Sequence, residues 1–292
     1  MMIKMAARAA ATAVLLLGAG CATVPEAGSP TRIGAVDPAL RAALAAPERP
    51  AESKARDTYR RPAETLAFWG LKPGMTVIEV QPGAEAWWTE ILAPYTARTG
   101  GRYIAGHADL NNPRISENAK KGRADFEARF ADEKLYGKVQ TVGFGPVSGP
   151  LGPPNSADMV ITARSVHGWL RVNMVDKAMN DFYAVLKPGG VLALEQHRAA
   201  PGVTDVKQMM DTGYVSEDLV IQAAAKAGFR LAGKSELNAN PKDTRDHPFG
   251  VWTLPPTRLS APFGQPANPA FDHAKYDAIG ESDRMTLKFV KP

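Results

Sequence analysis

The chain has 292 residues, of which 45% are hydrophobic and 22% are charged. This is the composition of an ordinary globular protein, and it excludes a disordered or fibrous chain. The formal net charge is +5, but Lys4 and Arg8 lie in an N-terminal leader, and removing them from the 35 basic residues leaves 33 against 30 acidic ones. A surplus of +3, with no run of Lys and Arg between aromatic residues, argues against nucleic acid as a partner.

The N-terminus has the features of an export signal. Lys4 and Arg8 precede an apolar stretch over residues 9–17, and small residues then lead to Cys21, the only cysteine. This pattern predicts a secretory signal over residues 1–20, too short to span a membrane as a helix.

The segment Leu17-Gly18-Ala19-Gly20-Cys21 resembles the lipobox of bacterial lipoproteins, with Gly18 where leucine is usual. The resemblance implies a lipid on Cys21 that anchors the protein to a membrane. Because Ala22 rather than aspartate follows, it also implies an outer-membrane lipoprotein that faces the periplasm. The alternative is an ordinary signal cleaved after Ala22, which would leave a soluble periplasmic protein.

The mature chain divides into two predicted parts. Residues 21–50 are rich in Ala, Pro and Gly without a sustained period, which predicts a flexible tether. Residues 51–292 alternate strand-like and helix-like segments and predict one domain.

The first half of this domain contains a β-branched apolar run over residues 75–80, typical of a strand buried on both faces. The elements expected around it are a helix over 62–69 closed by Gly70, the strand 75–80, a helix over 87–95, a strand over 101–106, and helix and loop over 111–136.

The second half continues the alternation. We expect strands over 138–144 and 157–163, a helix over 173–186 ended by the turn Lys187-Pro188-Gly189-Gly190, a strand over 191–195, a helix from the N-cap Ser216 to Lys226, and strands over 229–237 and 285–291. Alternation of this kind predicts an α/β fold with a parallel sheet covered on both faces, and such sheets bind ligands at the carboxyl ends of their strands.

Several stretches resemble a family of predicted bacterial exported class I S-adenosylmethionine-dependent methyltransferases. The stretches are Val77–Gly83, Trp88–Tyr95, Arg164–Trp169, Leu186–Leu192, Asn238–Thr244, Gly250–Pro256 and Glu281–Leu287. The resemblance covers residues 55–292. It implies the Rossmann-like methyltransferase fold, with a mostly parallel seven-stranded sheet and helices on both faces.

The resemblance places S-adenosylmethionine beside Glu79, Gln81, Gly83, Trp88, His107 and Asp109. The sequence departs from the family pattern in three places. Gln81 and Glu85 stand where glycines usually alternate with Gly83, and the Glu85 carboxylate would repel that of the cofactor unless an arginine pairs with it. His107 replaces the acid expected to bind the ribose, with Asp109 as a candidate substitute. The stretch 144–146 lacks the residue that reads the adenine.

Side chains suited to catalysis follow two adjacent strands. Arg164 and His167 follow the fourth strand, and His197 and Arg198 follow the fifth. A histidine there can take a proton from an attacking hydroxyl or amine. We therefore predict Arg164, His167 and His197 as catalytic residues. The alternative is that they are loop residues that bond to backbone and water.

Two further groups are open to more than one interpretation. Trp87, Trp88 and Trp169 could wall an aromatic ligand or pack in the core. Asp243, Asp246 and His247 have no specific metal spacing, so no metal site is predicted. They lie in a long segment, residues 238–283, which we interpret as a lid with Asn238, Asn240 and Lys242 at its hinge.

Three functions agree with the sequence. The first is S-adenosylmethionine-dependent methyl transfer to a small molecule. The second is a non-catalytic envelope protein that binds another ligand in a degenerate cofactor site. The third is an assembly lipoprotein that uses the domain as an interaction surface.

Overall fold

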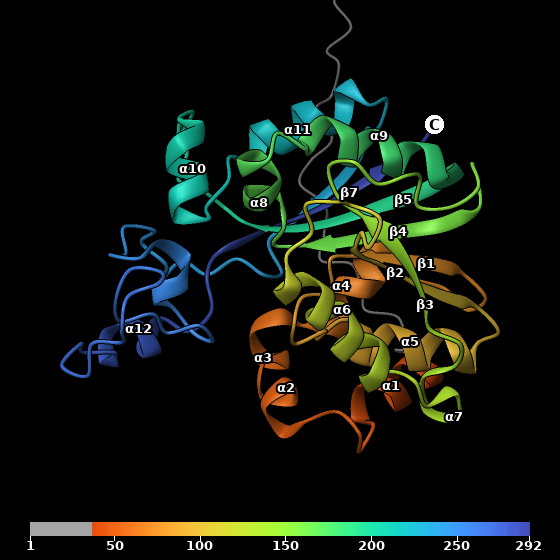
Figure 1. Ribbon diagram of the computed structural model, residues 1–292, viewed down its shortest axis with the longest axis horizontal. Coiled ribbons are helices and arrows are strands. Elements are labelled where there is room, and N and C mark those ends of the chain that lie inside the picture. Colours follow the sequence, from red (N-terminus) through yellow and green to blue (C-terminus); the bar gives the residue numbers. More distant parts are fainter. Residues whose placement is uncertain (1–36) are drawn as a thin grey trace, which may run out of the picture. The chain divides into compact units, whose positions relative to one another are not determined.

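The computed structural model describes residues 37–292. A seven-stranded sheet lies at its centre, in the order β3-β2-β1-β4-β5-β7-β6 (Figure 1). The pairs from β3 to β5 are parallel, and β7 runs antiparallel to both of its neighbours. The strands are β1 (Thr76–Val80), β2 (Arg102–Ala108), β3 (Gln140–Phe144), β4 (Ala157–Ala163), β5 (Leu186–His197), β6 (Arg230–Ser235) and β7 (Arg284–Val290). The predicted Rossmann-like fold is confirmed.

Helices cover both faces of the sheet (Figure 1). On one face lie α8 (Val166–Arg171), α9 (Val175–Val185), α10 (Val206–Thr212) and α11 (Glu217–Lys226). On the other lie α1 (Pro38–Ala45), α2 (Ala51–Ala55), α3 (Asp57–Arg60), α4 (Pro62–Trp69), α5 (Thr89–Arg98), α6 (Glu117–Arg129) and α7 (Glu133–Tyr136). Strand β1 is buried between them, because Val77 packs with the α5 layer and Ile78 with the α9 layer.

The predicted tether is wrong for residues 38–50. Helix α1 begins there with Asp37 as its N-cap, and Leu40 and Ala43 are buried in the core that α5 also joins. Arg49 is buried as well, with its guanidinium 2.8 Å from the Asp57 carboxylate. An eight-residue alanine-rich helix has little stability of its own, so its signal in the sequence is weak and tertiary packing stabilises it. The predicted signal over 1–20, Cys21 and the rest of the tether lie outside the described residues.

Leu40→Ala is expected to lower the free energy of unfolding by about 2 kcal/mol, because it leaves a cavity between α1 and α5. Urea unfolding measures this loss. Leu110→Ala is the matched control, since Leu110 is 49% exposed and its truncation should cost less than about 0.5 kcal/mol. Equal stability of the two variants would contradict the packing of α1 against the domain.

The turn predicted at Lys187–Gly190 lies inside β5, where it interrupts the pairing of β5 with β4. Leu186 pairs with Ala157, and pairing then resumes at Val191 with Met159, so the intervening residues leave the register. The remaining strands agree with the predicted ranges within about two residues. Helices α2, α3, α8, α10 and α12 were not predicted.

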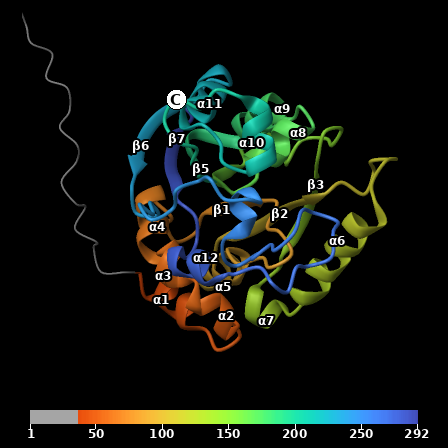
Figure 2. The ribbon, with the colours of Figure 1, turned by 90° about the vertical axis from the view of Figure 1, so that its left-hand side faces the viewer.

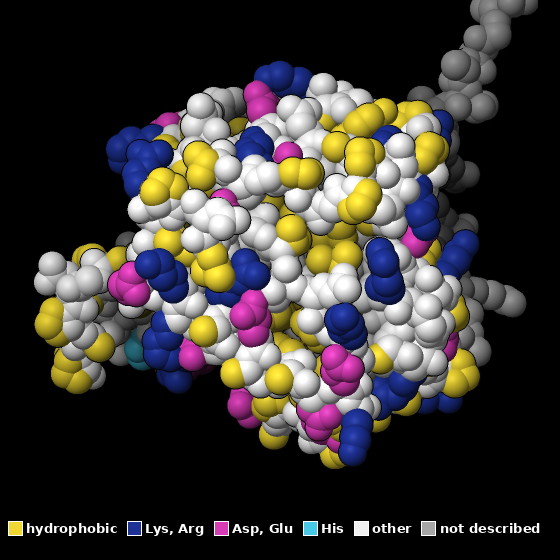
Figure 3. Space-filling model, turned by 45° about the vertical axis from the view of Figure 1, so that its right-hand side comes forward, with side chains coloured by type: hydrophobic (Ala, Val, Ile, Leu, Met, Phe, Trp, Pro, Cys, Tyr) yellow, Lys and Arg dark blue, Asp and Glu magenta, His cyan; other side chains and the backbone are white. Residues whose placement is uncertain are grey.

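Residues 238–283 cross in front of the carboxyl ends of the strands, with the 3₁₀ turn η1 (Gly250–Thr253) and helix α12 (Ala274–Ile279) in them (Figure 2). The face drawn in Figure 3 mixes basic and acidic side chains without a broad patch of either sign. Within residues 37–292, no helix is long and apolar enough to cross a membrane.

Candidate functional site

The turn after β1 opens toward the carboxyl edge of the sheet. Gln81 and Gly83 both adopt the left-handed conformation, with φ of 54° and 75°. Gln81 Oε1 accepts a hydrogen bond of 2.7 Å from Trp169 Nε1, which holds a non-glycine residue in this strained conformation. A Cβ on Gly83 would meet no atom within 4 Å, so a ligand can approach the backbone there closely.

The ends of β4 and β5 and the start of β7 bring three basic side chains together. Arg164 follows β4 with φ of 60°, and its backbone N–H donates to the Glu195 carbonyl at 2.8 Å. His197 ends β5 and is the cross-strand partner of Arg284. The three predicted residues Arg164, His167 and His197 lie at one edge, as expected. Arg284 was missed because antiparallel pairing of β7 with β5 brings together residues distant in sequence.

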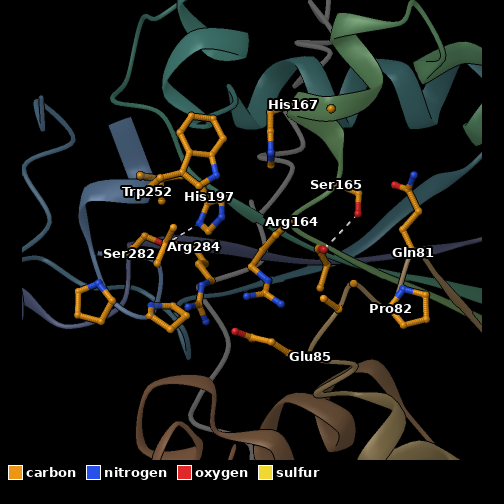
Figure 4. Close-up of a pocket in the computed structure, with 18 residues that line it drawn as sticks. Gln81, Pro82, Glu85, Arg164, Ser165, His167, His197, Trp252, Ser282 and Arg284 are labelled. Atoms are coloured by element: carbon orange, nitrogen blue, oxygen red, sulfur yellow. Dashed lines mark hydrogen bonds between the residues drawn. The ribbon is translucent and has the colours of Figure 1, made fainter. Parts of the chain in front are cut away.

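These side chains line a cavity of about 540 Å³, within the range of small-molecule sites (Figure 4). The walls come from the β1 turn, the end of β4, the end of β5 and the lid. Among the lining residues are Gln81, Gly83, Glu85, Arg164, Ser165, His167, His197, Trp252, Ser282 and Arg284. The lid contributes Val251, Trp252, Pro255, Pro256, Thr257 and Ser282 to the lining, so the predicted lid does border the cavity.

Hydrogen bonds fix the tautomer of His167. The Gln196 side-chain oxygen accepts from the Val166 backbone N–H at 3.1 Å, so its amide nitrogen faces His167 Nδ1 at 3.3 Å. The amide can only donate, so Nδ1 accepts and the neutral ring carries its proton on Nε2. Burial, together with the positive charges of Arg171 and Arg164, lowers the pKa of His167 to about 4. The ring is therefore a neutral hydrogen-bond donor at pH 7.

His197 leaves one ring nitrogen free to accept a proton. Its Nδ1 lies 2.6 Å from Ser282 Oγ, a residue of the lid. Burial and the positive charges of Arg284 and Arg164 hold the pKa of His197 well below its usual value. The ring is therefore neutral at pH 7, and when Nδ1–H donates to Ser282, Nε2 has a free lone pair.

A buried network of ion pairs supports the cavity from below. Glu281 accepts from Arg60 Nε at 2.9 Å and from Arg56 Nε at 2.6 Å, and it also pairs with Arg284. Arg284 Nη1 lies 3.1 Å from the carboxylate of Glu195. Helices α2 and α3, the lid and strands β5 and β7 are thus joined through buried charges.

The Glu85 carboxylate is paired with Arg56 at the rim. This is the condition under which a carboxylate can lie near an anionic ligand, since the guanidinium offsets its charge.

The other predicted cofactor residues lie outside this cavity. Trp88 is buried and packs on Trp69 and Trp87. The His107 ring packs on Phe126, and Asp109 accepts a hydrogen bond from the Asn111 backbone at 3.0 Å. Trp87 and Trp169 are core residues too, each 1% exposed. Of the cofactor set, Gln81 and Gly83 line the cavity.

Glu79 is buried behind the turn and accepts hydrogen bonds from Tyr103 at 2.7 Å and Thr89 at 2.9 Å. Burial raises its pKa to about 7 despite these bonds. Between the usual value of 4.5 and about 7, the folded state keeps a proton that the unfolded state has lost. This residue therefore makes stability fall as the pH rises through that window, by up to about 3 kcal/mol.

Glu79→Gln is expected to remove this pH dependence, because an amide does not titrate. Urea unfolding across the window should show the variant becoming more stable relative to wild type as the pH rises. Glu133→Gln, on an exposed helix end, is the control and should leave the slope unchanged. Parallel curves for wild type and Glu79→Gln would contradict a neutral Glu79.

The lid is fastened at its base by Asp243. Its carboxylate accepts hydrogen bonds from Tyr214 at 3.0 Å, from His247 Nε2 at 2.8 Å and from the Asp283 backbone N–H at 2.7 Å. Asp246 is exposed and bonds to its neighbour Thr244 instead. Within residues 37–292, no group of three or more His, Cys, Asp or Glu side chains could hold a metal ion.

Arg198 does not line the cavity with its neighbour His197. Its guanidinium pairs with Asp283 at 2.9 Å and with Glu236 at 2.7 Å. A histidine and an arginine were predicted at the ends of both β4 and β5. Of the two arginines, only Arg164 lines the cavity.

No known protein family matches the sequence, and no curated protein is similar to it. Solved structures with this fold include the [4+2]-cyclase SpnF, 18% identical over 80% of this chain and 81% of that chain, with a TM-score of 0.50. A predicted sarcosine dimethylglycine methyltransferase from Galdieria sulphuraria is 13% identical over 89% of this chain and 92% of that chain, with a TM-score of 0.50.

A SAM-dependent methyltransferase from Aquifex aeolicus is 20% identical over 62% of this chain and 86% of that chain, with a TM-score of 0.44. The likeness to the two structures with a TM-score of 0.50 shows the fold, which is the Rossmann-like methyltransferase fold. Because one of these structures is named as a cyclase, the reaction has to be argued from the site itself.

Proposed function

We propose that this protein is an S-adenosylmethionine-dependent methyltransferase that acts on a small molecule. The observation that carries the proposal is the position of the cavity, at the carboxyl ends of β1 and β4. The chain continues to β2 and β3 on one side of this point and to β5 on the other, so this is the switch point of the sheet. Open α/β sheets bind their ligands there.

The cavity fits the amino-acid end of the cofactor. The left-handed turn at Gln81 and Gly83 leaves room for a ligand against the backbone, and Arg56 neutralises Glu85 at the rim. Asp109, directly after β2, is our candidate for the ribose hydroxyls. When bound, S-adenosylmethionine supplies an electrophilic methyl group on a sulfonium.

The chain's own residues can prepare an acceptor for that methyl group. His197 can take the proton of an attacking hydroxyl or amine at Nε2, while Ser282 holds its Nδ1. His167 can donate from Nε2 to an acceptor oxygen and fix its orientation. The Trp252 ring packs edge-on against His167, with centroids 5.5 Å apart, and closes the cavity on the lid side.

A second function, non-catalytic binding of another ligand on the same fold, is favoured by one observation. His107 and Asp109, which were predicted to bind the ribose, lie outside the cavity. The basic side chains that line it lie at the ends of β4 and β5 and at the start of β7 instead. In this case the cavity would hold a ligand other than the cofactor.

We further propose that the protein resides in the cell envelope, through the predicted signal at residues 1–20 and a lipid on Cys21. Mass spectrometry of the membrane fraction tests this, because a diacylglycerol on Cys21 adds a defined mass. A chain cleaved after Ala22 would reject the anchor.

Calorimetric titration of the full chain with S-adenosylmethionine and S-adenosylhomocysteine tests the main proposal. We expect micromolar affinity for both molecules. An absence of heat, and of any thermal shift, at millimolar concentration would reject methyl transfer. A different small molecule found by mass spectrometry in protein purified from its native source would then favour the second function.

A further inference from the structure

We propose that Arg164 and Arg284 together bind an anionic group, a carboxylate or a phosphate, on the molecule that accepts the methyl group. The assignment of that molecule as the acceptor rests on the function proposed above. The anion site itself is carried by the unpaired guanidinium donors in the cavity.

Arg164 has no protein acceptor for its guanidinium. In residues 37–292 no hydrogen bond or ion pair joins this side chain to another residue, although its backbone N–H is bonded to Glu195. Figure 4 shows its guanidinium in the cavity, beside that of Arg284. A guanidinium carries five N–H donors and remains charged, so a partly buried one without an acceptor is suited to a ligand oxygen.

Arg284, which lies beside Arg164 in the cavity, offers donors of the same kind. It is only 2% exposed, and its Nε makes no hydrogen bond within the described part of the chain. Its Nη1 lies 3.1 Å from the Glu195 carboxylate, so Nε is the donor that lacks a partner. Its ion pairs with Glu195 and Glu281 hold the guanidinium in position. A buried donor without a partner costs about 1–3 kcal/mol, and a bound oxyanion would remove that cost.

The charges around the cavity favour an anion. Four arginines and three glutamates lie in it or directly behind it: Arg56, Arg60, Arg164, Arg284, Glu85, Glu195 and Glu281. These seven residues give a balance of one positive charge, and Glu85, 55% exposed at the rim, contributes least inside. Glu79, behind the β1 turn with a pKa of about 7, offsets part of that charge near Arg164. The two histidines are neutral and add no charge, and His167 offers its Nε2–H as a donor.

The positions of the donors also suit a planar or tetrahedral oxyanion. Arginine can bind such groups through two parallel N–H bonds. His167 adds its Nε2–H at the same cavity. The acceptor we infer is therefore a small acid or phosphate ester whose reacting atom lies toward His197.

The test is titration of the full chain with succinate and with inorganic phosphate, at low ionic strength. Dimethyl succinate, which lacks the charges, is the ligand control and should not bind. Arg164→Gln is expected to weaken the binding of the tighter anion by about tenfold or more, and Arg164→Lys by less. The anion that binds more tightly assigns the group as carboxylate or phosphate.

Arg258→Gln is the matched control variant, because Arg258 pairs with Asp277 in the lid and does not line the cavity. It should leave anion affinity unchanged. Equal affinities for Arg164→Gln and Arg258→Gln, or an absence of anion binding to wild type, would overturn the proposal. Arg164 is preferred for substitution because removal of Arg284 would strand two buried glutamates and threaten folding.

Two nucleoside probes separate this inference from the proposed function. If Arg164→Gln weakens binding of S-adenosylhomocysteine but not of methylthioadenosine, which lacks the carboxylate, the arginines hold the cofactor and the acceptor assignment is overturned. If S-adenosylhomocysteine never binds while succinate or phosphate binding depends on Arg164, the anion site stands and methyl transfer is rejected.

Discussion

Replacing Gly83 with leucine is expected to lower the affinity for S-adenosylhomocysteine by about a hundredfold, as measured by calorimetry. Gly83 has φ of 75°, and the space where its Cβ would stand is empty and borders the cavity. A leucine there would occupy the space in which the ligand approaches the backbone. The left-handed backbone adds a cost of about 1–2 kcal/mol in stability for any L-residue.

Gly202→Leu is the control for that backbone cost. Gly202 has φ of 82°, a Cβ at this position would also meet no atom within 4 Å, and the residue does not line the cavity. The two variants should lose similar stability in urea, while only Gly83→Leu loses binding. Unchanged affinity in Gly83→Leu would show that the turn does not contact the cofactor.

Glu281→Gln is expected to lower the free energy of unfolding by about 3–5 kcal/mol, the usual cost of removing one partner from a buried ion pair. The variant leaves Arg56, Arg60 and Arg284 without their shared carboxylate. Urea unfolding at neutral pH measures the loss. Glu117→Gln, whose carboxylate is 86% exposed beside Lys120, should change stability by less than about 0.5 kcal/mol.

The same residue predicts a loss of stability in acid. Burial alone would raise the pKa of Glu281, but the charges of Arg284 and Arg56 outweigh it and hold the pKa below the usual 4.5. The folded state then binds fewer protons than the unfolded state, so this stability is present above pH 4.5 and is lost as the pH falls through the folded value. Glu281→Gln should lack this acid-sensitive part. Identical acid profiles for the two proteins would contradict the network.

The sheet could be predicted because its central strands have a strong local signal. In β1, Val77, Ile78 and Val80 are apolar on both faces of the strand, as a strand buried on both faces requires. Helix α1 could not be predicted, since Leu40 and Ala43 become significant only when α5 is beside them. Such helices are missed in a sequence because their stabilising contacts come from residues far along the chain, although the contacts themselves are extensive.

Some residues of the candidate site could likewise be predicted from the sequence, and others could not. Arg164, His167 and His197 could be placed at one edge because parallel strands bring their carboxyl ends together. Arg284 and Ser282 depend on the antiparallel return of β7, which no local pattern fixes. The protonation of His167 depends on the orientation of Gln196, a contact that only the folded chain defines. The chemical roles of these residues stay predictions.

The fastening of the lid by Asp243 bears on how this protein can diversify. The carboxylate of Asp243 holds the backbone of Asp283, so the two ends of the intervening segment stay together whatever lies between them. Doubling the length of a closed loop costs only about 0.6 kcal/mol in chain entropy. Trp252 and the prolines beside it could therefore be replaced, lengthened or shortened without rebuilding the sheet. Ligand preference then depends on the lid, and fold stability depends on the sheet and its helices. Exchanging the lid for another is expected to change which ligand binds without changing the stability of the fold.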